Sequence, residues 1–122
     1  AYAAIISGFA LKSMEYAIGI SPFISLHAFT VGGIGLVTIG MMSRVSLGHT
    51  GRNVFEPPAI ITWSFLLLLV AAIIRVIFPL FNMELYVYWI AISQFAWITA
   101  FAIFVYVYAP MLLSARADGR DG

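Results

Sequence analysis

The sequence predicts an all-α membrane protein: a polytopic bundle fragment of transmembrane helices, with three full spans and one partial span at the N-terminus. Two observations predict this class. Hydrophobic residues make up 63% of the 122 residues and charged residues only 9%, whereas water-soluble domains carry about 25% charged residues. The chain also contains apolar runs long enough to cross a bilayer. We therefore expect lipid to surround most of the polypeptide.

Short polar connections divide the apolar runs. Each run is expected to be helical, because a lipid-facing backbone must satisfy its own hydrogen bonds. The predicted segments are a partial helix at 1–18, a helix at 22–43, a loop at 44–57, helices at 58–80 and 85–109, and a polar tail at 114–122. Pro110 is expected to stop or kink the last helix. Lys12 and Glu15 are expected near one membrane face, where charges are tolerated. The chain begins at Ala1 without a basic leader, so we expect it to belong to a longer protein.

The positions of the arginines predict the orientation. The 44–57 loop and the tail must share one side of the membrane, because two helices separate them. The arginines outside the predicted spans fall on that side: Arg44, Arg52, Arg116 and Arg120. Lys12 is the basic residue of the opposite side. By the positive-inside rule, the loop and the C-terminus are predicted to be cytoplasmic.

Several function classes are excluded by composition. A formal net charge of +1 without a cluster of Lys and Arg argues against nucleic acid as a partner. With Cys at 0, disulfides and thiolate metal sites are excluded, so a bound metal or haem would use His, Met, Tyr or carboxylate ligands. No spacing of Ser, Asp and His suggests a hydrolytic site. Whether the protein turns over a substrate is left open.

The 22–43 helix carries the most informative residue, His27. On a helical wheel it shares a polar stripe with Thr30 and Thr38, and glycines lie on both flanks. Such a helix is expected to face protein or a cofactor. Two interpretations of His27 stay open: a hydrogen bond to a neighbouring helix, or an axial ligand of haem or copper.

The connection RVSLGHTGR, residues 44–52, contains His49 between Arg44 and Arg52. Its glycines Gly48 and Gly51 permit positive φ and expose backbone N–H groups, so the loop is a candidate site for an anion such as a haem propionate. The alternative is an ordinary inner loop whose arginines touch lipid phosphates. A continuous helix would separate His27 from His49 by about 33 Å, which argues against one shared metal centre.

Arg75 is the one charged residue inside the 58–80 helix. It is predicted either to extend its side chain towards the membrane surface or to pair with Glu84 or a propionate. Tyr88 and Trp89 lie at matching depth in the next helix. Gln94 is expected to hydrogen-bond between helices.

The run LHAFTVGGIGLVTIGMMSRVSLGHTGR, residues 26–52, followed by two hydrophobic helices, resembles the C-terminal portion of the NnrS family. This resemblance implies a multi-pass protein of the bacterial inner membrane that contains haem and copper and is linked to nitric oxide metabolism and nitrosative stress. His27 and His49 match the motif histidines, so both become candidate metal ligands. Nitric oxide (NO) is the small ligand that the resemblance implies.

A rival prediction is a non-catalytic transmembrane subunit. In that case the glycine-rich helix would pack against other transmembrane helices of a larger complex. The presence or absence of a visible Soret absorption in purified material distinguishes the two.

Overall fold

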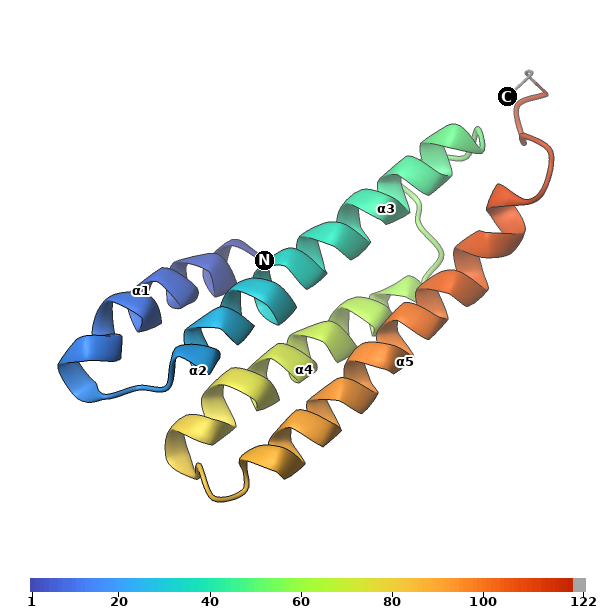
Figure 1. The fold of residues 1–122 in the computed structure, drawn as a ribbon. Coiled ribbons are helices and arrows are strands. Elements are labelled where there is room, and N and C mark those ends of the chain that lie inside the picture. The colour runs from blue at the N-terminus through green and yellow to red at the C-terminus, as the bar shows by residue number, and fades with distance from the viewer. Residues whose placement is uncertain (120–122) are drawn as a thin grey trace.

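The computed structural model describes residues 1–119, which form helices joined by short connections (Figure 1). The elements are α1 (Tyr2–Ile18), α2 (Pro22–His27), the π-helix η1 (Ala28–Ile34), α3 (Gly35–His49), α4 (Ile61–Phe81) and α5 (Tyr86–Leu112). α2, η1 and α3 follow one another without a break and form one long rod, Pro22–His49. Residues 1–119 contain no strand. The predicted all-α fold is confirmed.

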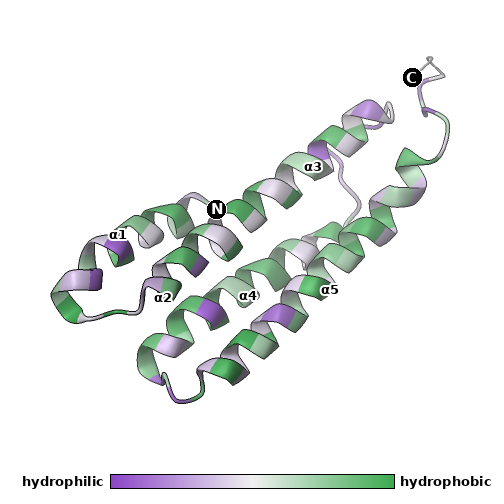
Figure 2. Ribbon diagram, viewed as in Figure 1, coloured by the Kyte–Doolittle hydropathy of each residue, from purple (hydrophilic) through white to green (hydrophobic). Residues whose placement is uncertain are grey.

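Three of these helical rods are long and apolar enough to cross a membrane. They are Pro22–His49 with 28 residues, Ile61–Phe81 with 21 and Tyr86–Leu112 with 27. Apolar residues dominate all three, and hydrophilic bands are few (Figure 2). Large apolar side chains such as Trp63, Val87 and Phe95 lie exposed on their outer surfaces. α1 has 17 residues, fewer than the roughly 20 that a full crossing requires. The chain is therefore a multi-pass membrane protein.

Two helices extend beyond their predicted ends. The sequence placed a loop from residue 44, but α3 continues to His49, because the first charged residue marks the edge of the apolar region and not the end of helical hydrogen bonding. Pro110 was expected to stop or kink the last helix, yet α5 continues through it to Leu112. A proline removes one hydrogen bond, and a membrane helix tolerates this loss.

α4 and α5 form an antiparallel hairpin that lies against the long rod (Figure 1). Leu68 on α4 and Ala100 on α5 are fully buried in the core, together with Ile39 on α3. Between α4 and α5, the buried hydroxyl of Ser93 donates a hydrogen bond to the carbonyl oxygen of Ala71 at 2.8 Å. This bond fixes the register of the two helices.

α1 packs on one half of the long rod, beside α2 and η1 (Figure 1). The approach is close, since a Cβ atom at Gly32 would lie 2.7 Å from the Cβ of Ala4, and one at Gly33 would lie 2.9 Å from Ile5. A Cβ at Gly8 would likewise lie 2.9 Å from the Phe29 ring. The small residues of η1 therefore serve contact between helices of this chain.

The two ends of the bundle differ. The α1–α2 and α4–α5 connections lie at one end, which we call the turn end, and the α3–α4 connection and the C-terminal segment lie at the other, the loop end (Figure 1). His27 is about one helical turn from the turn end, whereas His49 lies at the loop end.

Candidate functional site

His27 is the last residue of α2, at the point where the helix widens into η1. π-helical turns are frequent at functional sites, because the extra residue redirects the side chains around it. The imidazole is half-buried. Its Nδ1 atom is buried and has no hydrogen-bond partner among residues 1–119. A buried polar atom without a partner is rare and calls for a ligand or water.

Arg75 on α4 lies close enough to His27 for their charges to interact. Its guanidinium is half-buried, and Nη1 donates a hydrogen bond to Oε1 of Gln94 on α5 at 3.2 Å. Its Nε atom is buried without a partner within the described residues. The ion pairs formed by residues 1–119 do not include a pair between Arg75 and Glu84.

Three helices thus bring His27, Arg75 and Gln94 together near the turn end. The predicted hydrogen bond of Gln94 between helices is confirmed. Tyr86, which sequence reasoning did not connect with the site, also lies within electrostatic range of Arg75. Tyr86 begins α5 directly after the short turn that follows α4. This position in the sequence could have indicated that Tyr86 lies near α4.

Tyr88 and Trp89, which the sequence places at the same membrane depth as Arg75, contact other residues. Trp89 donates from Nε1 to the carbonyl oxygen of Asn82 at 3.2 Å and packs on the Phe78 ring with centroids 4.8 Å apart. Tyr88 is 66% exposed. Neither forms a hydrogen bond with His27 or Arg75 within residues 1–119.

The polar stripe predicted on the long rod does not form one packed face. Thr30 and Ile34 are exposed, while Gly32, Gly33 and Gly35 are buried. The reason is that η1 departs from the 100° spacing of an α-helix, so residues on its two sides do not share one wheel. The glycine flank therefore faces α1 and α4, whereas Thr30 and Ile34 of the stripe are exposed.

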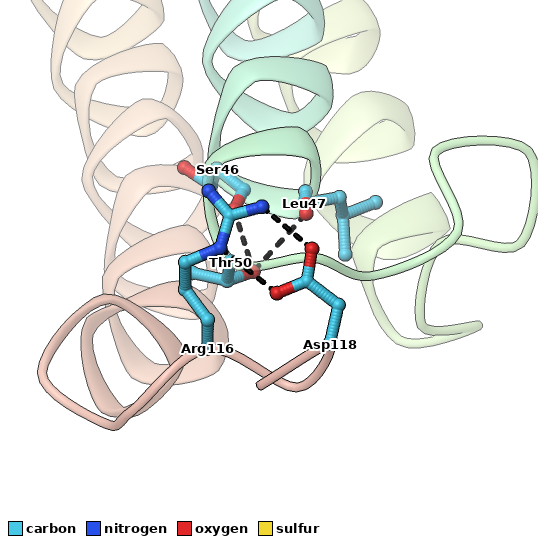
Figure 3. Close-up of polar contacts among 5 residues, drawn as sticks. All are labelled: Ser46, Leu47, Thr50, Arg116 and Asp118. Atoms are coloured by element: carbon cyan, nitrogen blue, oxygen red, sulfur yellow. Dashed lines mark hydrogen bonds and ion pairs between the residues drawn. The ribbon is translucent and has the colours of Figure 1, made fainter. Parts of the chain in front are cut away.

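At the loop end, the GHTGR segment caps α3. Gly51 has φ +70°, its N–H donates to the Gly48 carbonyl at 3.2 Å, and the Arg52 N–H donates to the Leu47 carbonyl at 2.9 Å. The Thr50 hydroxyl donates to the Ser46 carbonyl at 2.7 Å (Figure 3). This is a Schellman arrangement, in which a left-handed glycine closes the helix. These backbone N–H groups are thus used by the helix, and Gly48 is helical, so the backbone does not offer the predicted anion cradle.

The C-terminal segment lies against this cap. The Ala117 N–H donates to the Thr50 carbonyl at 2.9 Å, and a Cβ at Gly51 would lie 2.6 Å from Asp118. Arg116 donates from Nε and Nη2 to the two carboxylate oxygens of Asp118 at 2.9 and 2.7 Å (Figure 3). These hydrogen bonds raise the pKa of Arg116. The loop and the tail therefore lie at the same end of the bundle.

The structure keeps the two predicted groups of site residues apart. His27 and Arg75 lie near the turn end, while Arg44, His49 and Arg52 lie at or near the loop end. α3 ends at His49, so the GHTGR segment does not turn back along the rod. The two histidines therefore lie near opposite ends of the long rod. His49 is exposed, and Nη1 of Arg52 is buried without a partner among residues 1–119.

Comparison with known proteins identifies the chain by its family. No curated protein and no solved structure matches it. A family model described as NnrS protein matches residues 1–116. This match covers nearly the whole chain, including both histidines and the three long helices, and the chain belongs to the NnrS family.

Proposed function

We propose that this chain is part of a haem-binding membrane protein of nitric oxide metabolism or the nitrosative stress response, with His27 as an axial haem ligand. One observation carries the proposal: an imidazole and a guanidinium, each with a buried nitrogen that lacks a partner among residues 1–119, come together from two membrane-spanning helices. Ionisable residues inside membrane spans are costly and mark functional sites. NnrS family membership supports the link to nitric oxide.

The donor set fits haem. Haem iron takes one imidazole as an axial ligand, and His27 supplies one without a competing hydrogen bond among residues 1–119. When bound, haem supplies an iron centre that binds NO and exchanges electrons. His27 would hold the haem through an imidazole nitrogen, within the apolar part of the long rod.

The residues fit copper less well. Protein copper sites use several nitrogen or sulfur ligands, and residues 1–119 contain no group of three or more His, Cys, Asp or Glu that could hold a metal ion. The proposal includes His49 as a candidate copper ligand. Arg44 and Arg52 are candidate partners of an anion at the same end of the bundle. Such a centre would need further ligands from outside the described residues.

The proposed orientation places the loop end in the cytoplasm and the protein in the bacterial inner membrane. The loop and the described part of the tail lie together, and Arg44, Arg52 and Arg116 belong to these segments or adjoin them; Arg120, the fourth arginine of the prediction, lies outside the described residues. The positive-inside rule assigns such an end to the cytoplasmic side.

The test is the optical spectrum of the intact protein purified in detergent. We expect a Soret band that His27→Ala removes or shifts, because the iron loses its axial ligand. Thr30→Val is the matched control, since Thr30 is exposed near His27 and its hydroxyl bonds only within its own helix. His49→Ala should leave this band unchanged. A band of normal position and height in His27→Ala would remove His27 from the ligand set.

The rival proposal, a non-catalytic subunit that uses the glycine-rich helix as its interface, loses its main support. Gly32 and Gly33 already contact α1 of the same chain. Colourless protein from haem-sufficient cells would favour this rival.

A further inference from the structure

Arg75 carries a positive charge inside a membrane-spanning helix and forms no ion pair with a carboxylate of residues 1–119. The ion pairs in the described part of the chain are Lys12–Glu15 and Arg116–Asp118. Charged groups within a membrane usually pair with an opposite charge or lie in a cavity, since their transfer to the bilayer centre costs about 2.5–3.5 kcal/mol on insertion scales. A counter-anion for Arg75 must therefore come from elsewhere.

The guanidinium is held inside the apolar region and does not extend to its surface. Its partner Gln94 lies two turns into α5, about 12 Å along the axis from the first residue, Tyr86. An arginine that extends towards lipid headgroups would point to the end of its own helix instead. The bond to Gln94 thus favours a ligand within the membrane over a lipid phosphate.

The free edge of Arg75 has the geometry for an oxyanion. Nη1 is used by Gln94, so Nε and Nη2 remain, and Nε is buried without a partner in the described part of the chain. The same two atoms of Arg116 bind both oxygens of Asp118. This edge presents two parallel N–H groups that match a carboxylate. Near the turn end, Arg75 therefore offers the same two donor atoms that Arg116 uses to bind Asp118 at the loop end.

Two further polar groups interact with Arg75. His27 and Tyr86 are within electrostatic range of Arg75, and the imidazole contributes a second buried nitrogen without a partner. A ligand held by His27 would therefore lie within the electrostatic range of Arg75.

We propose that Arg75, positioned by Gln94, binds a carboxylate of the ligand held at His27, namely a propionate of haem. This inference rests on the proposed function. Arg75 neutralises the propionate within the membrane, and Gln94 keeps the Nε–Nη2 edge turned to it. Tyr86 lies beside the same site.

The experiment combines Arg75→Gln with haem whose propionates are esterified. The intact protein is loaded with haem or with haem dimethyl ester, and the rate of haem transfer to excess apomyoglobin is measured. We expect Arg75→Gln and esterification each to speed haem loss on the order of tenfold, as for a lost hydrogen bond to a charged group. The two changes together should do no more than either alone, because they remove the same contact. The optical signature of His27 ligation should persist.

Two further variants sharpen the result. Gln94→Glu gives Arg75 a carboxylate of its own, so it should speed the loss of ordinary haem as Arg75→Gln does. Arg116→Gln is the matched control, because it makes the same substitution at the loop end, and it should have no effect.

Additive effects of Arg75→Gln and esterification, or no effect of either, would overturn the inference while His27 ligation stands. Loss of bound phospholipid in Arg75→Gln, with no effect of esterification, would assign the edge to a lipid phosphate and also overturn it. Wild-type protein that binds no haem would overturn the proposed function itself, and this inference with it.

Discussion

Gly32 is the residue at which the packing of α1 is most sensitive. A methyl group there would lie 2.7 Å from the Cβ of Ala4, which cannot rotate away. We expect Gly32→Ala to destabilise the protein by about 1–3 kcal/mol, as other overpacked sites do, and to separate α1 from η1. Thermal unfolding in detergent measures the loss.

Gly40 supplies the matched control for this prediction. A Cβ there meets the Phe65 ring at 3.7 Å, an ordinary contact. Gly40→Ala should therefore be neutral or should stabilise by up to about 1 kcal/mol through helix propensity. Equal melting temperatures for the two variants would show that α1 does not pack on η1 as described.

Glu15 predicts a response to pH at the turn end, outside the three long spans. Its buried carboxylate accepts a hydrogen bond from Lys12 at 2.8 Å and another from Ser25 on α2. The bonds from Lys12 and then Ser25 lower the pKa of Glu15. A lowered pKa stabilises the fold above the unfolded value of about 4.3, and this contribution is lost as the pH falls through the lower, folded value.

We therefore expect acidification to below about pH 4 to loosen α1 from α2. The loosening is measured as the labelling rate of a cysteine introduced at Ser21, because a cysteine at Ser25 would itself remove one of the two hydrogen bonds to Glu15. This labelling rate should rise in acid. In Glu15→Gln the labelling rate should no longer depend on pH over this range. A wild-type rate that is unchanged in acid would contradict the prediction.

At the scale of the element, a buried polar bond between helices contributes to the α4–α5 hairpin. Ser93→Ala removes the bond to the Ala71 carbonyl, and we expect it to cost about 0.6 kcal/mol and at most about 1.7 kcal/mol, the range for such bonds in membrane proteins. Thr99→Val is the control, because the Thr99 hydroxyl donates to Phe95 within α5 itself. Thr99→Val should change the free energy of unfolding less than Ser93→Ala does.

The sequence predicted the elements better than their boundaries and phases. Apolar length identifies α4 and α5 because a bilayer imposes it, but neither the end of α3 at His49 nor the continuation of α5 through Pro110 follows from hydropathy. η1 was missed because an additional residue per turn leaves no mark in composition. The polar stripe through His27 failed for the same reason.

The site was predicted only in its parts. The sequence singled out His27 and Arg75 because ionisable residues are rare in apolar runs. It could not show that Gln94 meets Arg75, since 19 positions separate them and only the α4–α5 register brings them together. The buried Nε and Nδ1 atoms likewise become visible only when the neighbouring helices are in place.

At the scale of the whole molecule, the fold predicts which segments share a side of the membrane. The 122 residues contain no cysteine, so cysteines introduced one at a time at Asn53, Ser114 and Asn82 are the only thiols in this segment. We expect a membrane-impermeant reagent to reach Asn53 and Ser114 from one side and Asn82 from the other. Under the proposed orientation, the first two react only in inside-out vesicles. Reaction of Asn53 and Ser114 from opposite sides would contradict the fold.

The hydrogen bond between Ala117 and Thr50 has a mechanical consequence. It ties the segment after α5 to the cap of α3, so the loop end acts as a hinge that holds the rods together. Near the turn end, α4 and α5 are joined by the short connection 82–85, and α2 packs on α4. If the rods spread to let a flat ligand reach His27, we expect them to open as a wedge at the turn end, pivoting about residues 50 and 117.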